Sequence, residues 1–287
     1  MLHLRLATAL LVALPALGCR SPGSSQDGGD GATAGPAATP APGAAPEPVA
    51  SASATPAAPV CRDLAESGPQ FPVYPLTKDF PVRGFDASSD VAWTTAKEKG
   101  ITFALLQATM GGKPNATFSA NWAMAAACGI KRGAYHFASP KADPEQQADG
   151  YVETAAGFGD FPPIVDVELP PGCKGPCCEL TCDAWRSTVG RILARVEKRA
   201  QRRPMVYTVE PFWKECLCNT SRFAEHALWL AGYPRFDPGS RPGFGGWQRW
   251  TIYQTAGNVK LGKGVVDADV FRGDAAELET FLAGAAK

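Results

Sequence analysis

The chain has 287 residues, 45% of them hydrophobic, and its 28 lysines and arginines balance 28 aspartates and glutamates. This length and hydrophobic content are enough for a packed core, which excludes a wholly disordered protein. Because the formal net charge is zero, no bulk attraction to nucleic acid or to anionic lipid is expected, and partners must be sought at local sites.

The first 19 residues resemble a bacterial export signal of the lipoprotein type. Arg5 precedes an apolar stretch that is too short for a comfortable transmembrane helix, and small residues lead up to Cys19. The end of this stretch, ALGC, resembles the lipobox, in which the cysteine is lipidated and becomes the mature N-terminus, although Leu is usual where this chain has the first Ala. An ordinary cleaved signal peptide is the alternative. We expect residues 1–19 to direct export to the bacterial cell envelope and Cys19 to carry a membrane anchor.

Residues 20–60 consist almost entirely of Ala, Pro, Gly, Ser and Thr, with no periodic apolar pattern. Such a segment buries too little surface to offset its ordering entropy, so a disordered tether is predicted. A flexible chain of roughly 40 residues has a root-mean-square reach of about 35 Å, and more with this much proline. Residues 61–287 are predicted to form one domain, which the tether would hold away from a membrane surface.

Nine cysteines fit an exported protein, and eight remain when Cys19 is set aside. Disulfides are the first interpretation. The cluster CKGPCCELTC at residues 173–182 could suggest a metal knot, but it is not a clean pair of C-x-x-C units, and an oxidising compartment disfavours free thiolates. We therefore expect disulfides and no metal, while the pairing of the eight cysteines stays open.

After Pro81, short apolar runs alternate with longer helical patterns, which is typical of successive βα units. Late in the chain the helical patterns shorten or vanish while the strands continue. Eight strands with an incomplete helix set predict an α/β fold, a modified TIM-like (β/α) barrel, with a doubly wound open sheet as the alternative. The strands are expected at residues 82–88, 101–109, 131–139, 162–169, 204–210, 227–233, 250–255 and 265–271.

Helices are predicted between the first five strands. The fourth helix has an apolar stripe at helical spacing, with Asp183 as its expected N-cap. Gly100 and Gly129 follow two of the helices just before the next strand, where glycine is typical of a helix C-terminus. The helices are expected at residues 90–100, 118–129, 143–158 and 183–201.

The run PPIVDVELP, residues 162–170, ends in two carboxylates, Asp166 and Glu168. Residues two apart in a strand share a face, so these side chains point the same way and Val167 points oppositely. In a parallel barrel, the carboxyl ends of the strands form the mouth, where polar residues that follow an apolar run lie. Neighbouring carboxylates push their pKa values apart, so one can hold a proton as a general acid while the other stays ionised. Taken alone, the pair would be better explained by a capping Asp166 and a solvated Glu168.

Acids and aromatic residues recur at the other predicted strand ends. Aromatic faces stack on the C–H faces of sugars and polar groups bind the hydroxyls, so such a mouth suits a carbohydrate. A hydrogen-bonded core position is an equal alternative for His136, and Trp229 and Phe137 could equally be core packing. The residues at these ends are Asp86, Tyr135, His136, Tyr207, Trp229, Tyr233, Gln254, Asp267 and Asp269.

The order of these motifs resembles family 25 of the glycoside hydrolases, which are barrel-shaped lysozymes that cleave peptidoglycan. The likeness runs from about Arg83 to Phe271. GFDAS matches the family's Gly-Ile/Phe-Asp-x-Ser, GAYHF matches Gly-Ala-Tyr-His-Phe, and PPIVDVE matches Pro-Pro-x-x-Asp-x-Glu. VYT, LWLAGY, YQ and VDADVF match the later strands of the family in the same order.

This resemblance implies that Glu168 is the general acid that protonates the glycosidic oxygen. Asp166 would orient or polarise the N-acetyl group of the substrate, which in this family is thought to act as the internal nucleophile, although a direct carboxylate role has also been argued. Asp86 and Asp267 would complete the acidic floor. A monomer that binds peptidoglycan glycan strands is expected, with no cofactor or metal. The sugar subsites would be shaped by Tyr135, His136, Tyr207, Trp229, Tyr233 and Gln254.

Two segments depart from the family pattern. The second strand ends in ATMGG instead of Ala-Thr-Glu-Gly, so Met110 stands where an acid is usual, and the Ser-His-Trp-Gln after the first aspartate is reduced to SSDVAW. The leading hypothesis is a muramidase that cleaves the β-1,4 bond between N-acetylmuramic acid and N-acetylglucosamine. The alternative, motivated by Met110, is a peptidoglycan-binding module without turnover, and a glycosidase on another N-acetylated polymer stays open. The cysteine-rich segment could wall off a subsite, although structural stapling is the simpler interpretation.

Overall fold

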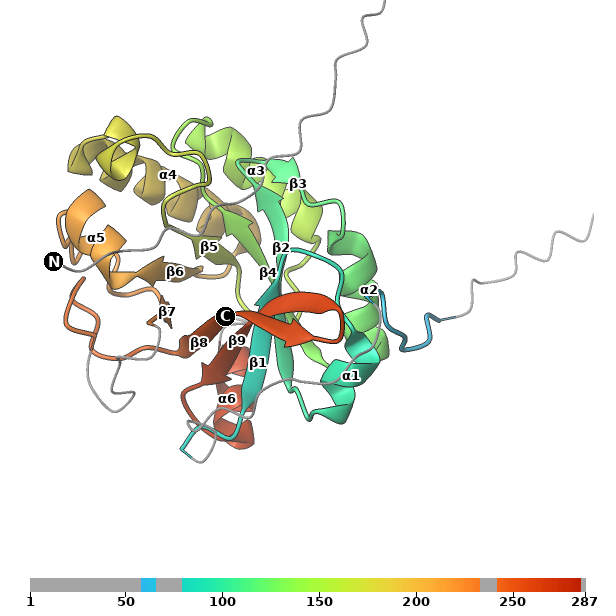
Figure 1. Ribbon diagram of the computed structural model, residues 1–287. Helices are drawn as coiled ribbons and strands as arrows, with labels where there is room; N and C mark the ends of the chain where they lie inside the picture. Colours follow the sequence, from blue (N-terminus) through green and yellow to red (C-terminus); the bar gives the residue numbers. More distant parts are fainter. Residues whose placement is uncertain (1–57, 66–78, 233–241, 285–287) are drawn as a thin grey trace, which may run out of the picture. The chain divides into compact units, whose positions relative to one another are not determined.

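The structure is a computed structural model that describes residues 58–65, 79–232 and 242–284 (Figure 1). The predicted export signal with Cys19, nearly all of the predicted tether, and Tyr233 lie outside the described residues. All eight predicted strands are confirmed, and a two-residue strand, β3, is added. The strands are β1 Arg83–Ala87, β2 Phe103–Met110, β3 Lys113–Pro114, β4 Lys131–Phe137, β5 Ile164–Asp166, β6 Met205–Val209, β7 Leu228–Ala231, β8 Ile252–Leu261 and β9 Gly264–Phe271.

The strands close into a barrel because β1 pairs with both β2 and β9. Pairing is parallel from β1 through β2, β4, β5, β6 and β7 to β8, whereas β9 runs antiparallel to both β8 and β1. The short β3 pairs only with β2 and lies outside this closed circuit. The predicted eight-stranded barrel is therefore confirmed as a closed mixed barrel, and the open-sheet alternative is wrong.

Helices cover the barrel between its early strands, as predicted, and become short later in the chain. Their bounds are α1 Trp93–Glu98, α2 Phe118–Ala127, α3 Pro144–Ala155, α4 Cys182–Ala200, α5 Glu210–Cys216 and α6 Ala275–Gly284. Strands β8 and β9 need no helix because a two-residue turn joins them, with Leu261 paired to Gly264. Among the described residues, no helix has the length and apolar character needed to cross a membrane.

The ends of the helices confirm one prediction and correct another. Gly100 and Gly129, which follow α1 and α2, have φ angles of +70° and +69° in the left-handed region that glycine adopts without steric cost. The N-cap of α4 is Thr181, whose side chain accepts a hydrogen bond from the N–H of Ala184 at 3.2 Å, and not Asp183 as predicted. Asp183 lies in the first turn, where its charge favours the helix dipole.

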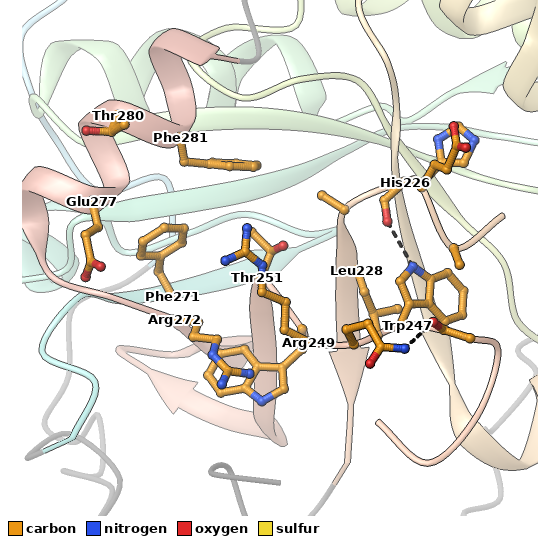
Figure 2. Close-up of a pocket in the computed structure, with 16 residues that line it drawn as sticks. His226, Leu228, Trp247, Arg249, Thr251, Phe271, Arg272, Glu277, Thr280 and Phe281 are labelled. Carbon is orange, nitrogen blue, oxygen red and sulfur yellow. Dashed lines mark hydrogen bonds between the residues drawn. The ribbon is translucent and has the colours of Figure 1, made fainter. Parts of the chain in front are cut away.

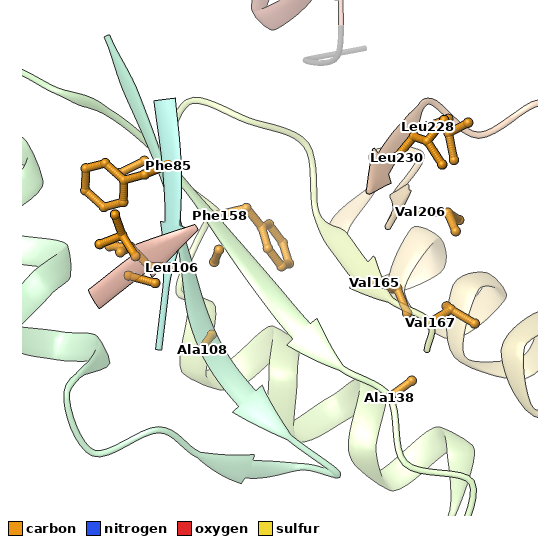
Figure 3. Packing of buried hydrophobic residues seen from close by; sticks show 14 of the residues in the cluster. Phe85, Leu106, Ala108, Ala138, Phe158, Val165, Val167, Val206, Leu228 and Leu230 are labelled. Carbon is orange, nitrogen blue, oxygen red and sulfur yellow. The ribbon is translucent and has the colours of Figure 1, made fainter. Parts of the chain in front are cut away.

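Alternation along the strands separates two apolar layers. In β5, Val165 and, just beyond it, Val167 belong to the outer layer, which packs between the strands and the helices (Figure 3). Ile164 belongs to the inner layer that fills the barrel, and Asp166 has the same parity. This confirms that Asp166 and Glu168 share a face opposite Val167. The outer layer thus fixes which way both carboxylates point.

Four disulfides join the eight cysteines that follow Cys19, which confirms the disulfide interpretation. Because all eight sulfur atoms are used in these bonds, the alternative of a metal knot at residues 173–182 is wrong. Cys61–Cys128 ties the start of the described domain to the end of α2. The other three bridges staple the loop after β5 internally and to α5 and its C-terminal end. These pairs are Cys173–Cys178, Cys177–Cys216 and Cys182–Cys218.

Candidate active site

A pocket with a volume of about 380 Å³ opens at the carboxyl ends of the parallel strands. This is the end of a (β/α) barrel where functional side chains gather, because each strand delivers its last residues there. Eight of the predicted site residues line the pocket. They are Asp86, Tyr135, Asp166, Glu168, Tyr207, Trp229, Gln254 and Asp267.

Asp166 ends β5 and is only 5% exposed. Its Oδ1 atom receives no hydrogen bond from any described residue, although the atom is shielded from solvent. Burial, together with the charges of Glu168 and Asp86, raises the pKa of this carboxyl well above its usual range. A ligand group that donates a hydrogen bond to Oδ1 would therefore be strongly favoured here.

Glu168 follows Asp166 by two residues and is partly exposed at the pocket. Burial raises the pKa of its carboxyl to about 7, and the charge of Asp267 adds to this shift. At neutral pH the carboxyl is therefore close to half protonated. A group with this pKa can donate a proton in one step and take one back in the next, which is what a general acid and base must do.

The floor of the pocket is a chain of buried hydrogen bonds across three strands. Tyr207 Oη donates to Gln254 Oε1 at 3.0 Å, and Gln254 Nε2 donates to Asp86 Oδ2 at 2.6 Å. Burial and the nearby Asp267 raise the pKa of Asp86 well above its usual range. Asp267 accepts a hydrogen bond from the backbone N–H of Asn258 at 2.7 Å, which partly offsets the rise in its pKa that burial causes. The acids of the floor are thus held in fixed positions.

The aromatic residues of the pocket lie at its base and pack against one another. Trp229 is only 1% exposed, and its ring centroid lies 5.9 Å from that of Tyr135 and 4.6 Å from that of Tyr207, both in edge-on contacts. Trp229 is therefore mainly a core residue, as the alternative held, although one part of its ring also lines the pocket. Such T-shaped packing fixes the rings of the two tyrosines.

The structure corrects the placement of His136, which was predicted to shape a sugar subsite. In β4, Tyr135 points into the barrel, so its neighbour His136 points outward. The ring is fully buried against Tyr151 of α3, with Nδ1 at 2.7 Å from Thr109 Oγ1 and Nε2 at 2.9 Å from Gln147 Oε1. Burial lowers its pKa to about 4, so the ring is neutral at pH 7. His136 is therefore a hydrogen-bonded core residue, which was the alternative to a role in a sugar subsite.

A β-bulge directs Met110 to the mouth of the pocket. Gln107 pairs with Tyr135, but the register between β2 and β4 then shifts, so that Thr109 pairs with His136 and Met110 with Phe137. Met110 is 38% exposed and lines the pocket. An uncharged side chain therefore lies at the mouth on β2, and in the closed barrel only β1 separates this strand from β9 and its acids.

Several residues that line the pocket were not predicted as site residues. Gln107 could have been found from the sequence, because a lone amide inside the apolar run FALLQA is unusual for a buried strand. Asn258 could not, because the predicted strand stopped at residue 255, whereas β8 continues to Leu261. Pro171 lines the pocket next to the stapled loop, but no cysteine among the described residues does, so stapling describes these disulfides better than a subsite wall.

A larger cavity of about 660 Å³ lies at the opposite end of the barrel, near the starts of β7 and β8 (Figure 2). It is lined by Arg249, Arg272 and Trp247 among others, and the indole N–H of Trp247 donates to the backbone carbonyl of His226 at 2.9 Å. None of the predicted site residues lines it. In the described part of the chain, no group of three or more His, Cys, Asp or Glu side chains is arranged to hold a metal ion.

Comparisons with known proteins agree with this geometry. A family model described as "Glycosyl hydrolases family 25" matches residues 85–263. Lysozyme M1 of Streptomyces globisporus is 32% identical over 207 residues, which cover 69% of this chain and 70% of that protein. An N,O-diacetylmuramidase of Arthroderma benhamiae is 28% identical over 216 residues, 72% of this chain and 89% of that protein. The crystal structure of a bacterial lysozyme from Streptomyces coelicolor superposes with a TM-score of 0.64 at 29% identity, covering 71% of this chain and 98% of that one.

Proposed function

The chain belongs to the family 25 glycosyl hydrolases, and we propose that its pocket cleaves the glycan strands of peptidoglycan with Glu168 as the general acid. It is a glycoside hydrolase of the lysozyme type. The observation that carries the assignment is the raised pKa of Glu168, about 7, in a pocket where it meets three further acids. The bond proposed to break is the β-1,4 linkage between N-acetylmuramic acid and N-acetylglucosamine.

In the proposed reaction, Glu168 gives its proton to the glycosidic oxygen as the bond to the anomeric carbon breaks. Asp166 Oδ1, to which no described residue donates a hydrogen bond, accepts the N–H of the substrate's acetamido group. The acetamido oxygen then attacks the anomeric carbon, and the positive charge of the cyclic intermediate faces Asp166. Glu168, now ionised, takes a proton from the water that opens this intermediate, so the enzyme returns to its starting state.

The remaining pocket residues are proposed to hold the sugar. Asp86 and Asp267 supply negative charge that keeps the proton on Glu168 and stabilises the developing oxocarbenium ion. Tyr135, Tyr207 and Gln254 present polar atoms at the pocket floor, and Trp229 supports the two tyrosine rings. Tyr233 remains a predicted subsite residue.

The organisation proposed for the whole chain is a signal over residues 1–19, a lipid anchor on Cys19, a tether over residues 20–60 and a catalytic domain over residues 61–287 that acts as a monomer. Four disulfides suggest export, because such bonds persist in oxidising compartments. The disulfide at Cys61 supports the boundary, since this residue is covalently tied to α2. The chemistry then takes place in the cell envelope.

The direct test is the identity of the products. Mass spectrometry after incubation of the purified protein with insoluble peptidoglycan is expected to find soluble muropeptides with N-acetylmuramic acid at the reducing end, because cleavage occurs on that side of the bond. Fragments that end in reducing N-acetylglucosamine would contradict the bond assignment. Protein that sediments with the wall and releases no fragments would favour the binding module, which the four acids at the pocket argue against.

The pH dependence of kcat/KM is expected to respond to Met110. In the wild type, kcat/KM falls as the pH rises past about 7, because Glu168 must hold its proton. Met110→Glu adds a carboxylate to the same pocket, and a like charge raises the pKa of Glu168, so this alkaline limb moves up by about half a unit. Met110→Gln, which adds no charge, is the matched control and leaves the limb in place. A downward shift in Met110→Glu would contradict the proposal.

A further inference from the structure

Asp269 lies beneath the pocket floor and has no part in the mechanism above. We propose that Asp269 is a positioning residue that stays protonated and donates a hydrogen bond to Asp86, which it holds ionised and correctly oriented on the floor. This inference rests on the proposed function, because it concerns the ionised carboxylate with which Asp86 faces the substrate. It assigns a role to a carboxyl that does not line the pocket.

The strand register places Asp269 one layer below the acids that face the pocket. In the antiparallel pair of β1 and β9, Asp86 lies opposite Asp267, and Gly84 lies opposite Asp269. Residues two apart share a face, so Asp269 points into the barrel beneath Asp267. Gly84 itself adds no side chain to this layer, and the ring of Phe103 fills the space beside it, since a Cβ at residue 84 would lie 2.3 Å from that ring.

The hydrogen bonds around Asp269 call for a proton on one of its oxygens. The residue is only 2% exposed, and Oδ1 accepts the indole N–H of Trp229 at 2.9 Å. No described residue donates a hydrogen bond to Oδ2, which is also shielded from solvent. An ionised carboxylate with one oxygen unpaired in this setting would be costly. A proton on Oδ2 removes the charge and turns that oxygen into a donor.

Asp86 is the acceptor that this donor requires, because the two carboxyl groups are in hydrogen-bond contact. Two carboxylates in contact cannot both be ionised, so the pair holds a proton. Asp86 already accepts Gln254 Nε2 at 2.6 Å and faces the pocket, whereas Asp269 is deeper. Burial raises the pKa of both carboxyls well above the usual range, and Oδ2 of Asp269 is the oxygen that receives no hydrogen bond from a described residue. The proton therefore belongs to Asp269.

The groups that face Asp269 favour the same assignment. Asp86 on β1 and Asp267 on β9 are the acids beside it, and both raise its pKa. From β7 and β8 come Trp229 and Gln254, which are neutral. The largest influences on the pKa values of the two carboxyls include no cation. A neutral Asp269 thus limits the negative charge of the floor while it supplies Asp86 with a second hydrogen bond.

Asparagine tests the inference because it has the same shape and donates without a titrating proton. In the full chain, Asp269→Asn is expected to keep kcat on peptidoglycan within about 3-fold of wild type, whereas Asp269→Leu, which lacks any donor, loses about 100-fold in kcat with little change in KM. Rescue by Asn and loss in Leu together support the role. An Asp269→Asn variant as impaired as Asp269→Leu, or an Asp269→Leu variant with normal kcat, would overturn it.

Two further measurements need no substrate and separate this inference from the proposed function. The infrared spectrum of the wild type at pH 7 is expected to contain the C=O band of a protonated buried carboxyl that Asp269→Asn lacks. The melting temperature of Asp269→Asn relative to wild type is expected to rise between pH 5 and pH 7. The reason is that folding raises the pKa of this carboxyl, so the wild-type protein loses stability as the pH rises above the pKa that the carboxyl has in the unfolded chain. Asparagine does not titrate, so the variant does not have this loss. Equal infrared spectra, together with a difference in melting temperature that does not change between pH 5 and pH 7, would overturn the inference even if Asp269→Leu failed to fold. A wild type that releases no muropeptides would overturn only the proposed function.

Discussion

Glu168→Gln is expected to lower kcat on peptidoglycan by about 10³-fold, which corresponds to about 4 kcal/mol of transition-state stabilisation. Glutamine keeps the size and the hydrogen-bonding capacity of the side chain but cannot release a proton to the glycosidic oxygen. Because Glu168 is partly exposed at the pocket and belongs to neither apolar layer, the fold should survive the change. Release of muropeptides over time measures the loss, and circular dichroism checks the fold.

The matched control is Glu98→Gln at the exposed end of α1, which makes the same chemical change away from the pocket and should leave kcat unaltered. A second check uses the pH profile. The alkaline limb that the wild type owes to the pKa of Glu168, about 7, should be absent from the residual activity of Glu168→Gln. Turnover by this variant at the wild-type rate, with the limb still present, would exclude Glu168 as the acid.

Local patterns in the sequence predict the strands well because the barrel imposes a strict alternation on them. Asp166 and Glu168 were placed correctly on one face by that rule alone. The same rule also explains the error at His136: Tyr135 and His136 are neighbours in one strand, so only one of them can point into the barrel. Resemblance to a motif identified both residues but could not distinguish the two faces of the strand.

Other features depend on contacts that no local pattern contains. Asp267 comes early in its strand, so in a wholly parallel barrel it would lie at the end away from the pocket. It reaches the mouth because β9 runs antiparallel to β1, which places it opposite Asp86. The bulge that turns Met110 toward the pocket and the pairing of the eight cysteines are likewise products of the folded arrangement. The direction of β9, the bulge and the disulfide pairing are set by tertiary contacts, which a single sequence does not determine.

Asp166→Asn is expected to lower kcat/KM on N-acetylated peptidoglycan by about 10²-fold to 10³-fold. Oδ1 of Asp166 is buried at the pocket, receives no hydrogen bond from the part of the chain that the structure describes, and would accept the acetamido N–H of the substrate. An asparagine removes the negative charge that favours the cyclic intermediate, and its NH₂ group can oppose that N–H. Asp166→Glu, which keeps the charge but displaces it by one methylene, should also be impaired and separates the effect of position from that of charge.

A substrate change identifies the route by which Asp166 acts. If the acetamido oxygen is the nucleophile, wild-type activity should collapse on peptidoglycan whose amino groups carry no acetyl, and Asp166→Asn should add little further loss, because both changes remove the same interaction. If Asp166 attacks the anomeric carbon itself, the wild type should retain activity on that substrate and Asp166→Asn should abolish it. The coupling between the two changes therefore decides between neighbouring-group participation and a covalent carboxylate intermediate. No described residue donates a hydrogen bond to Oδ1, which fits the first mechanism, since that mechanism needs an oxygen able to accept the acetamido N–H.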